Sequence, residues 1–209
     1  MSTLPYHRLR RARAHVLLTL CLIVAATACS PTAREAPLCL PTAVIGLIEP
    51  VADAMHEVDI ERAIGLWTVT EANACDDRLR VRALIERSRL YASRFDHDRA
   101  VADMDAAVAL TPDDPLVYVE RGQRVMLLYE WNRVLADYNR ALQLDPLYAD
   151  AHYYRAILYA SVPEAADARR AALADFERYL ELAPDGSHAA RARQYADQLA
   201  AQIAALDTP

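Results

Sequence analysis

Apolar and small residues recur through the middle of the chain with a fixed period of 34 residues. The string AVADMDAAVALTPDD, which begins at Ala100, superposes without a gap on VLADYNRALQLDPLY, which begins at Val134. Pro112 of the first string accordingly lies 34 residues before Pro146 of the second. Self-similarity at this period predicts a stack of supersecondary units, because a single unit cannot bury its apolar face alone.

The C-terminal stretch from Ser187 to Leu206 has helical rather than alternating spacing. Its apolar residues follow the 3.6-residue period of a helix, and its polar residues fall mostly on the opposite face. The apolar set is Ala192, Tyr195, Ala196, Leu199, Ile203 and Leu206. This pattern predicts one amphipathic helix, which Asp185 or Ser187 can cap at its start.

The N-terminal stretch, residues 1–28, has the pattern of an export signal. Four arginines and no acidic residue precede the 13-residue apolar run Val16–Ala28. A membrane-spanning helix needs about 20 apolar residues, so the shorter run predicts the apolar core of a signal peptide.

The end of this run, Ala26-Thr27-Ala28-Cys29, resembles the lipobox of bacterial lipoproteins. The resemblance implies cleavage before Cys29 and acylation of that residue, palmitate being a typical acyl chain. After this cleavage Ser30 is the second residue of the mature chain, and a serine there resembles the sorting pattern for the outer membrane, if the cell has one. The alternative is an ordinary secretory signal that leaves Cys29 a free thiol. Residues 29–41, with three prolines, predict a stiff tether.

The 34-residue units resemble the tetratricopeptide repeat (TPR), an antiparallel pair of helices A and B. The family pattern has a small residue at position 8, an aromatic at 11, alanine at 20, an aromatic at 24, alanine at 27 and proline at 32. Residues 81–114 supply Ser88, Tyr91, Ala100, Met104, Ala107 and Pro112; residues 115–148 supply Gly122, Val125, Val134, Tyr138, Ala141 and Pro146; residues 149–186 supply Ala156, Tyr159, Ala172, Phe176, Tyr179 and Pro184.

The resemblance implies an all-α solenoid of about four helix pairs and a capping helix. Residues 42–80 form a degenerate first pair, with its first helix near Ala43–Glu57; the alternative is a capping hairpin with no repeat ancestry. Residues 81–114, 115–148 and 149–186 form three repeats, and residues 187–209 form the cap. The third repeat has four extra residues, expected in its inter-helix turn near Val162–Ala168.

Two cysteines remain for a disulfide, Cys39 and Cys75. Cys39 precedes the expected first helix A and Cys75 ends the expected first helix B, and these two ends are neighbours in a helix pair. A bridge would close a loop of about 36 residues and stabilise the weakest repeat by about 3–4 kcal/mol. The alternative is two unpaired thiols.

Composition narrows the range of functions. The chain has 23 basic residues, all of them arginine, against 29 acidic residues. The acidic surplus argues against nucleic-acid binding. With no lysine and only four glycines, the chain has no Schiff-base lysine and no Gly-rich phosphate loop. Its histidines are scattered without metal-ligand spacing, so the prediction is no enzyme, no metal and no cofactor.

The expected binding surface is the concave face of the helices A. By TPR register its positions 2, 5, 9, 12 and 13 hold Arg82, Ile85, Arg89, Ala92 and Ser93; then Leu116, Val119, Gln123, Met126 and Leu127; then Asp150, Tyr153, Ile157, Ala160 and Ser161. Tyr153 and Tyr154 are expected as surface anchors, and Trp131 lies in an inter-helix turn. The alternative for Met126 and Leu127 is packing on neighbouring helices.

The interpretation is a lipid-anchored scaffold that binds a protein or peptide partner in the bacterial cell envelope, on the exported face of a membrane. A peptidoglycan- or glycan-binding module is the alternative. The carboxylate clamp of chaperone-binding TPRs is absent, because the corresponding positions hold Ile85, Arg89, Glu120, Asp150 and Tyr154.

Overall fold

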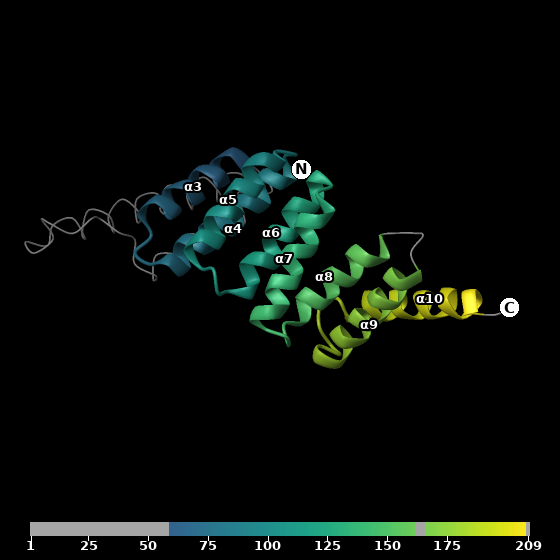
Figure 1. Ribbon diagram of the computed structural model, residues 1–209. Coiled ribbons are helices and arrows are strands. Elements are labelled where there is room, and N and C mark those ends of the chain that lie inside the picture. The colour runs from purple at the N-terminus through teal and green to yellow at the C-terminus, as the bar shows by residue number, and fades with distance from the viewer. Residues whose placement is uncertain (1–58, 162–165, 208–209) are drawn as a thin grey trace, which may run out of the picture. The chain divides into compact units, whose positions relative to one another are not determined.

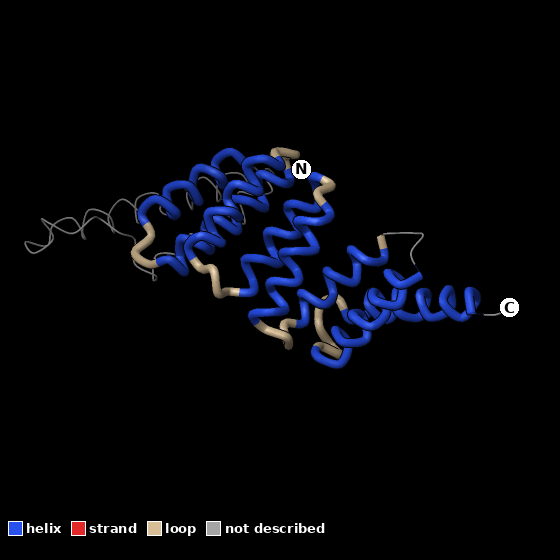
Figure 2. Tube along the Cα trace, in the orientation of Figure 1, coloured by secondary structure: helices blue, strands red, loops and turns tan. Residues whose placement is uncertain are grey.

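The computed structural model describes residues 59–161 and 166–207, where the chain is helical and has no strand (Figures 1 and 2). The helices are α3 (Ile60–Asn73), α4 (Asp77–Ser93), α5 (His97–Leu110), α6 (Pro115–Val125) with the short 3-10 helix η1 (Met126–Leu128), α7 (Trp131–Leu144), α8 (Ala149–Ala160), α9 (Ala166–Leu182) and α10 (Ala189–Asp207). The all-α prediction is confirmed for this part of the chain. The export signal, Cys29, the tether, Cys39 and the predicted helix Ala43–Glu57 lie outside the described residues.

Each helix packs against the next one along the chain, and the helices A also contact one another, α4 with α6 and α6 with α8. Helices α4 and α5, α6 and α7, and α8 and α9 are the three predicted pairs. Helix α9 begins at Ala166, so part of the stretch expected as a longer turn is helical. Trp131, predicted in a turn, is the first residue of α7.

Aspartates begin four successive helices. Asp59, Asp76, Asp96 and Asp114 each accept a hydrogen bond from a backbone N–H of the first turn of α3, α4, α5 and α6. Such caps satisfy amide donors that have no partner inside the helix. The acidic pairs Asp76-Asp77 and Asp113-Asp114 thus each contribute one capping residue, Asp76 and Asp114.

Close helix contact in the second repeat depends on Gly122. A Cβ atom at this position would lie 2.4 Å from Cε1 of Tyr138, whose side chain is completely buried. The ring of Tyr138 therefore fills the space that any larger residue on α6 would need. This explains the small residue at position 8 and the large one at position 24 of this repeat.

Each of the three repeats also contains the same buried ion pair between its helices. An arginine of helix A donates through Nε and Nη2 to one aspartate of helix B. The pairs are Arg87 with Asp103 (2.9 and 2.7 Å), Arg121 with Asp137 (3.0 and 2.6 Å) and Arg155 with Asp175 (2.7 and 2.8 Å). Two parallel bonds in this geometry are among the strongest that arginine makes.

A third nitrogen of each arginine reaches back to the preceding helix B. Nη1 of Arg87, Arg121 and Arg155 donates to Thr68 (3.2 Å), Asp105 (3.0 Å) and Asn139 (2.8 Å) respectively. One side chain thus joins both helices of its own repeat to the repeat before it. We call each of these arrangements an arginine staple.

The third repeat and α10 share an aromatic core. Tyr153 stacks on His188 with ring centroids 4.2 Å apart, and it also contacts Phe176 and Tyr179. Phe176 in turn stacks on Tyr195 of α10 at 5.4 Å. Helix α10 therefore covers the last repeat, as predicted for a capping helix.

Candidate functional site

A groove of about 550 Å³ lies between α4 and the first half of α6. It is lined by Arg78, Val81, Arg82, Ile85, Glu86, Arg89, Thr111, Asp114, Leu116 and Glu120. Helix α4 contributes a row of arginines alternating with apolar residues, and α6 contributes its first turn. We call this space the α4–α6 groove.

The floor of the groove is a charge network around Glu120. Its carboxylate accepts from Nη2 of Arg89 at 2.5 Å and from Nη2 of Arg124 at 3.1 Å, and its side chain is 8% exposed. Arg89 also donates to Glu86 at 2.9 Å. A buried carboxylate needs such partners, because desolvation of an unpaired charge is costly.

The balance between burial and the neighbouring acids differs for the two arginines of this network. Burial lowers the pKa of Arg124, although Glu120 works against it. Burial also opposes the charge on Arg89, but Glu120 and Glu86 outweigh it and hold the Arg89 pKa above its usual value. Both remain charged at neutral pH, so the floor offers fixed cations that are already paired with acids.

The mouth of the groove is less constrained than its floor. Arg78 is exposed, and its guanidinium makes no ion pair with any residue in the described part of the chain. Leu116 is partly exposed at the start of α6, where the Asp114 carboxylate is occupied by the backbone N–H of Leu116 (2.9 Å). The mouth therefore presents a cation and an apolar surface together.

The structure brings together only some of the residues that the TPR register predicted. Arg82, Ile85, Arg89 and Leu116 line the α4–α6 groove. Gln123, Met126, Ile157, Ala160 and Asp150 are partly buried and do not line it. Met126 packs on the core, as its alternative interpretation stated, whereas Leu127 is exposed.

Two residues predicted to contact a partner, Val119 and Tyr153, are buried in the structure. Val119 is 2% exposed because it lies in the core shared by the first two repeats, and Tyr153 is 3% exposed because its ring packs against Phe176, Tyr179 and His188. Ile85, at the same position of its repeat, is also buried but still forms part of the groove wall. Tyr153 is therefore a core residue of the third repeat and not a surface anchor.

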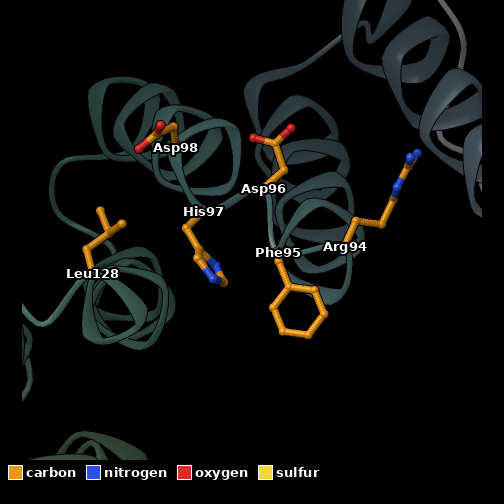
Figure 3. A pocket seen from close by; sticks show the side chains of 6 residues that line it. All are labelled: Arg94, Phe95, Asp96, His97, Asp98 and Leu128. Carbon is orange, nitrogen blue, oxygen red and sulfur yellow. The ribbon is translucent and has the colours of Figure 1, made fainter.

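The turns that follow the helices A carry exposed aromatic residues. Phe95 and Tyr129 have φ values of 61° and 60°, and their side chains are 84% and 75% exposed. Beside the first turn lies a hollow of about 350 Å³, lined by Arg94, Phe95, Asp96, His97, Asp98 and Leu128 (Figure 3). In Figure 3 the rings of Phe95 and His97 point to the same side, away from the two carboxylates.

Other kinds of site are not found among the described residues. No three His, Cys, Asp or Glu side chains there are grouped so that they can hold a metal ion. None of the helices in these ranges has the length and apolar character to cross a membrane. Cys75 lies between α3 and α4, and since Cys39 is outside the described residues, their pairing stays a prediction.

Similarity to known proteins is seen in structure and not in sequence. No protein-family model matches the chain, and a comparison with curated proteins finds no match. A tetratricopeptide repeat protein from Parabacteroides merdae superposes with a TM-score of 0.58 at 18% identity, covering 78% of this chain and 62% of that one.

Two further solved structures give the same result. The first TPR of Spaghetti (RPAP3), bound to the HSP90 peptide SRMEEVD, has a TM-score of 0.54 at 21% identity and covers 62% of this chain and 98% of that one. MamA has a TM-score of 0.53 at 19% identity, over 73% and 90% of the two chains. The chain therefore has the TPR helical-solenoid fold.

Proposed function

We propose that this chain is a protein–protein interaction scaffold whose α4–α6 groove binds an extended segment of a partner protein. The observation that carries the proposal is a groove of about 550 Å³ on the predicted face of the helices A, with apolar and charged walls. A known structure of the same fold, RPAP3, was solved with a bound peptide, which supports a peptide as the ligand class.

The lining predicts the chemistry of the bound segment. Ile85 and Leu116 provide an apolar wall on each side, so an apolar side chain of the segment is expected between them. Arg78 and Arg82 lie one helical turn apart on α4, and an acidic residue of the segment is expected beside them.

A chaperone tail bound through its terminal carboxylate is not the expected ligand. The paired carboxylate of Glu120 forms the floor of the groove, where a second carboxylate would be repelled. We therefore expect an internal acidic segment of the partner that keeps its own carboxylates at the mouth.

Site-specific photo-crosslinking in the full-length chain tests this function. A crosslinker in place of Leu116 is expected to capture a defined protein, whereas a crosslinker in place of the exposed Leu147 is not. The charge reversals Arg78→Glu and Arg82→Glu together should remove at least nine-tenths of the captured product. Equal capture from both positions, or capture of glycan instead of protein, would overturn the proposal.

We propose in addition that Cys29 carries the lipid that holds this scaffold in the bacterial cell envelope, on the exported face of a membrane. The proposal is supported by the apolar run ending in Ala26-Thr27-Ala28-Cys29. Several acyl chains bind firmly, since each buried methylene contributes about 0.8 kcal/mol. Mass spectrometry of the mature N-terminus should show an acylated Cys29, and Cys29→Ser should release the protein from membranes. An unmodified terminus would contradict the anchor.

The Cys39–Cys75 disulfide is part of the same proposal, because an exported protein folds where disulfides persist. Counting thiols in the mature protein with and without reductant tests it. We expect two thiols to appear only after reduction; two reactive thiols without reductant would contradict the bridge.

A further inference from the structure

The turns that end the helices A of the first two repeats expose large aromatic side chains at equivalent positions. Phe95 and Tyr129 lie 34 residues apart and share a left-handed backbone, with φ values of 61° and 60°. This conformation favours glycine, and a bulky residue in it is strained. Because both side chains are largely exposed, burial does not compensate for the strain, and folding gives no reason for an aromatic residue here.

A second ring accompanies each of these residues. His97 meets Phe95 edge to face at 6.1 Å, and Trp131 meets Tyr129 edge to face at 5.6 Å. The turn hollow of about 350 Å³ lies beside the first pair, and Leu128 closes it on the side of the second repeat (Figure 3). We call the surface formed by these five residues the aromatic edge.

We propose that the aromatic edge binds a proline-rich segment of a partner protein that carries a basic residue. Neighbouring packed helices lie about 8–10 Å apart, which sets the spacing expected between equivalent turns. A polyproline II helix advances about 9 Å in its three-residue turn. Prolines spaced three residues apart therefore suit the spacing expected between the two turns, and aromatic-lined surfaces are the usual docking sites for such helices.

Charge favours a basic segment. Asp98 lines the turn hollow on the side opposite the two rings (Figure 3), is exposed, and among the described residues has no ion pair. A basic side chain that reaches past the rings can therefore meet its carboxylate. The neighbouring Arg94 and Asp96 are engaged, with Glu61 and with Arg99 respectively. The chain as a whole carries a net charge of −6, which disfavours an anionic membrane surface as the occupant.

This proposal is independent of the α4–α6 groove. The groove is lined by residues 78–89 of α4 and by the first half of α6, whereas the aromatic edge follows the ends of the same helices. A scaffold with both surfaces can hold two segments at once, one at each end of its helices A.

An array of proline-rich nonapeptides tests the proposal with the mature chain. Proline at every third position is combined with arginine at each remaining position, and matched arrays replace proline by alanine or arginine by glutamate. We expect binding to the proline-arginine array at least tenfold above both matched arrays. The emission of Trp131 should shift on binding, because it is the exposed tryptophan of the described residues, whereas Trp67 is buried.

The decisive variant is Phe95→Gly combined with Tyr129→Gly. It removes both rings and relieves the backbone, so Tm should stay equal or rise while peptide affinity falls at least tenfold. Phe95→Asn with Tyr129→Asn is a second variant, since asparagine tolerates the left-handed conformation. Val69→Ala with Leu147→Ala removes two other exposed apolar side chains, which lie elsewhere, and should leave binding unchanged.

Several outcomes would overturn the proposal. They are binding of no proline-rich peptide, full affinity in both ring-removal variants, or loss of affinity only where Tm has fallen. Binding of peptidoglycan fragments or of phosphatidylglycerol vesicles in place of the peptides, lost in the glycine variant, would assign the edge to a different ligand. Asp98→Asn should reduce affinity several-fold and weaken its dependence on salt.

Discussion

Buried carboxylates occur in two settings in this molecule, and the difference separates residues that hold the fold from residues that shape a site. Asp103, Asp137 and Asp175 belong to arginine staples, one in every repeat. Glu120 is equally buried and also held by arginine, but within the described part of the chain its network occurs once, between the first two repeats. The equivalent position in the third repeat is Tyr154.

Comparing the repeats therefore separates structural features, which recur, from features that occur at one place. A feature that recurs in each described repeat has a structural role that each repeat requires. The staple fixes helix A against helix B of the same repeat and against helix B of the preceding one. A charge network that appears once is not required by the architecture. The Glu120 network also lines the α4–α6 groove, so its location agrees with a role in binding.

The largest expected effect comes from breaking a staple. Arg121→Ala leaves the Asp137 carboxylate buried without its two strongest donors. Removing one partner of a buried pair typically costs about 3–5 kcal/mol, because the remaining charge stays desolvated. Urea unfolding of the variant and of the unmodified chain measures this cost.

Two matched variants decide whether the comparison holds. Arg133→Ala removes an exposed pair with Asp105 and should cost less than about 1 kcal/mol. Arg89→Ala removes one of the two arginines that donate to Glu120 but leaves Arg124 in place. We therefore expect it to lower the free energy of unfolding by only about 1 kcal/mol while groove binding is lost. Equal destabilisation by Arg89→Ala and Arg121→Ala would remove the distinction between staple and site.

A smaller effect is expected at the close contact between Gly122 and the ring of Tyr138. Gly122→Ala drives a methyl group into the ring of Tyr138 and should destabilise the fold by about 1–3 kcal/mol. Gly65→Ala is the matched control, since a Cβ atom there meets nothing within 4 Å. It should stabilise α3 by about 0.5–1 kcal/mol. Thermal unfolding of both variants tests the pair, and a neutral Gly122→Ala would show that Tyr138 can move.

The sequence predicted the solenoid because its strongest signals are local and periodic. The 34-residue spacing, the prolines and the small residue Gly122 all reflect contacts that each repeat makes with itself. The arginine staples were not predicted, although the spacing of Arg87, Arg121 and Arg155 contains the signal: each arginine has an aspartate 16 or 20 residues later.

The binding surface was harder to predict, since the register of a family gives positions and not their exposure. Tyr153 illustrates the limit. Its burial depends on Phe176, Tyr179 and His188, which lie 23 to 35 residues later in the sequence and whose contact with Tyr153 the register does not reveal. The exposed aromatic turns were missed for a related reason, because a positive φ at a non-glycine residue leaves no sequence pattern.

The smallest expected effect distinguishes two staples, that of Arg121 with Asp137 and that of Arg155 with Asp175. Burial favours the protonated form of both aspartates. At Asp137 burial prevails over the bonds from Arg121 and raises its pKa. At Asp175 the bonds from Arg155 and from Nδ1 of His152 (2.8 Å) outweigh burial, so the pKa of Asp175 lies below its ordinary value.

These opposite directions predict opposite pH dependence of stability. The stabilisation linked to Asp175 is present above the ordinary carboxyl pKa and is lost as pH falls through the lower folded value, whereas that linked to Asp137 is present at low pH and declines as pH rises through its raised folded value. Unfolding free energies of Asp175→Asn and Asp137→Asn should be measured by urea from about pH 6 to 3. The deficit of Asp175→Asn relative to the unmodified chain should shrink on acidification, and that of Asp137→Asn should grow. If both deficits change with the same sign, His152 does not distinguish the third staple from the second.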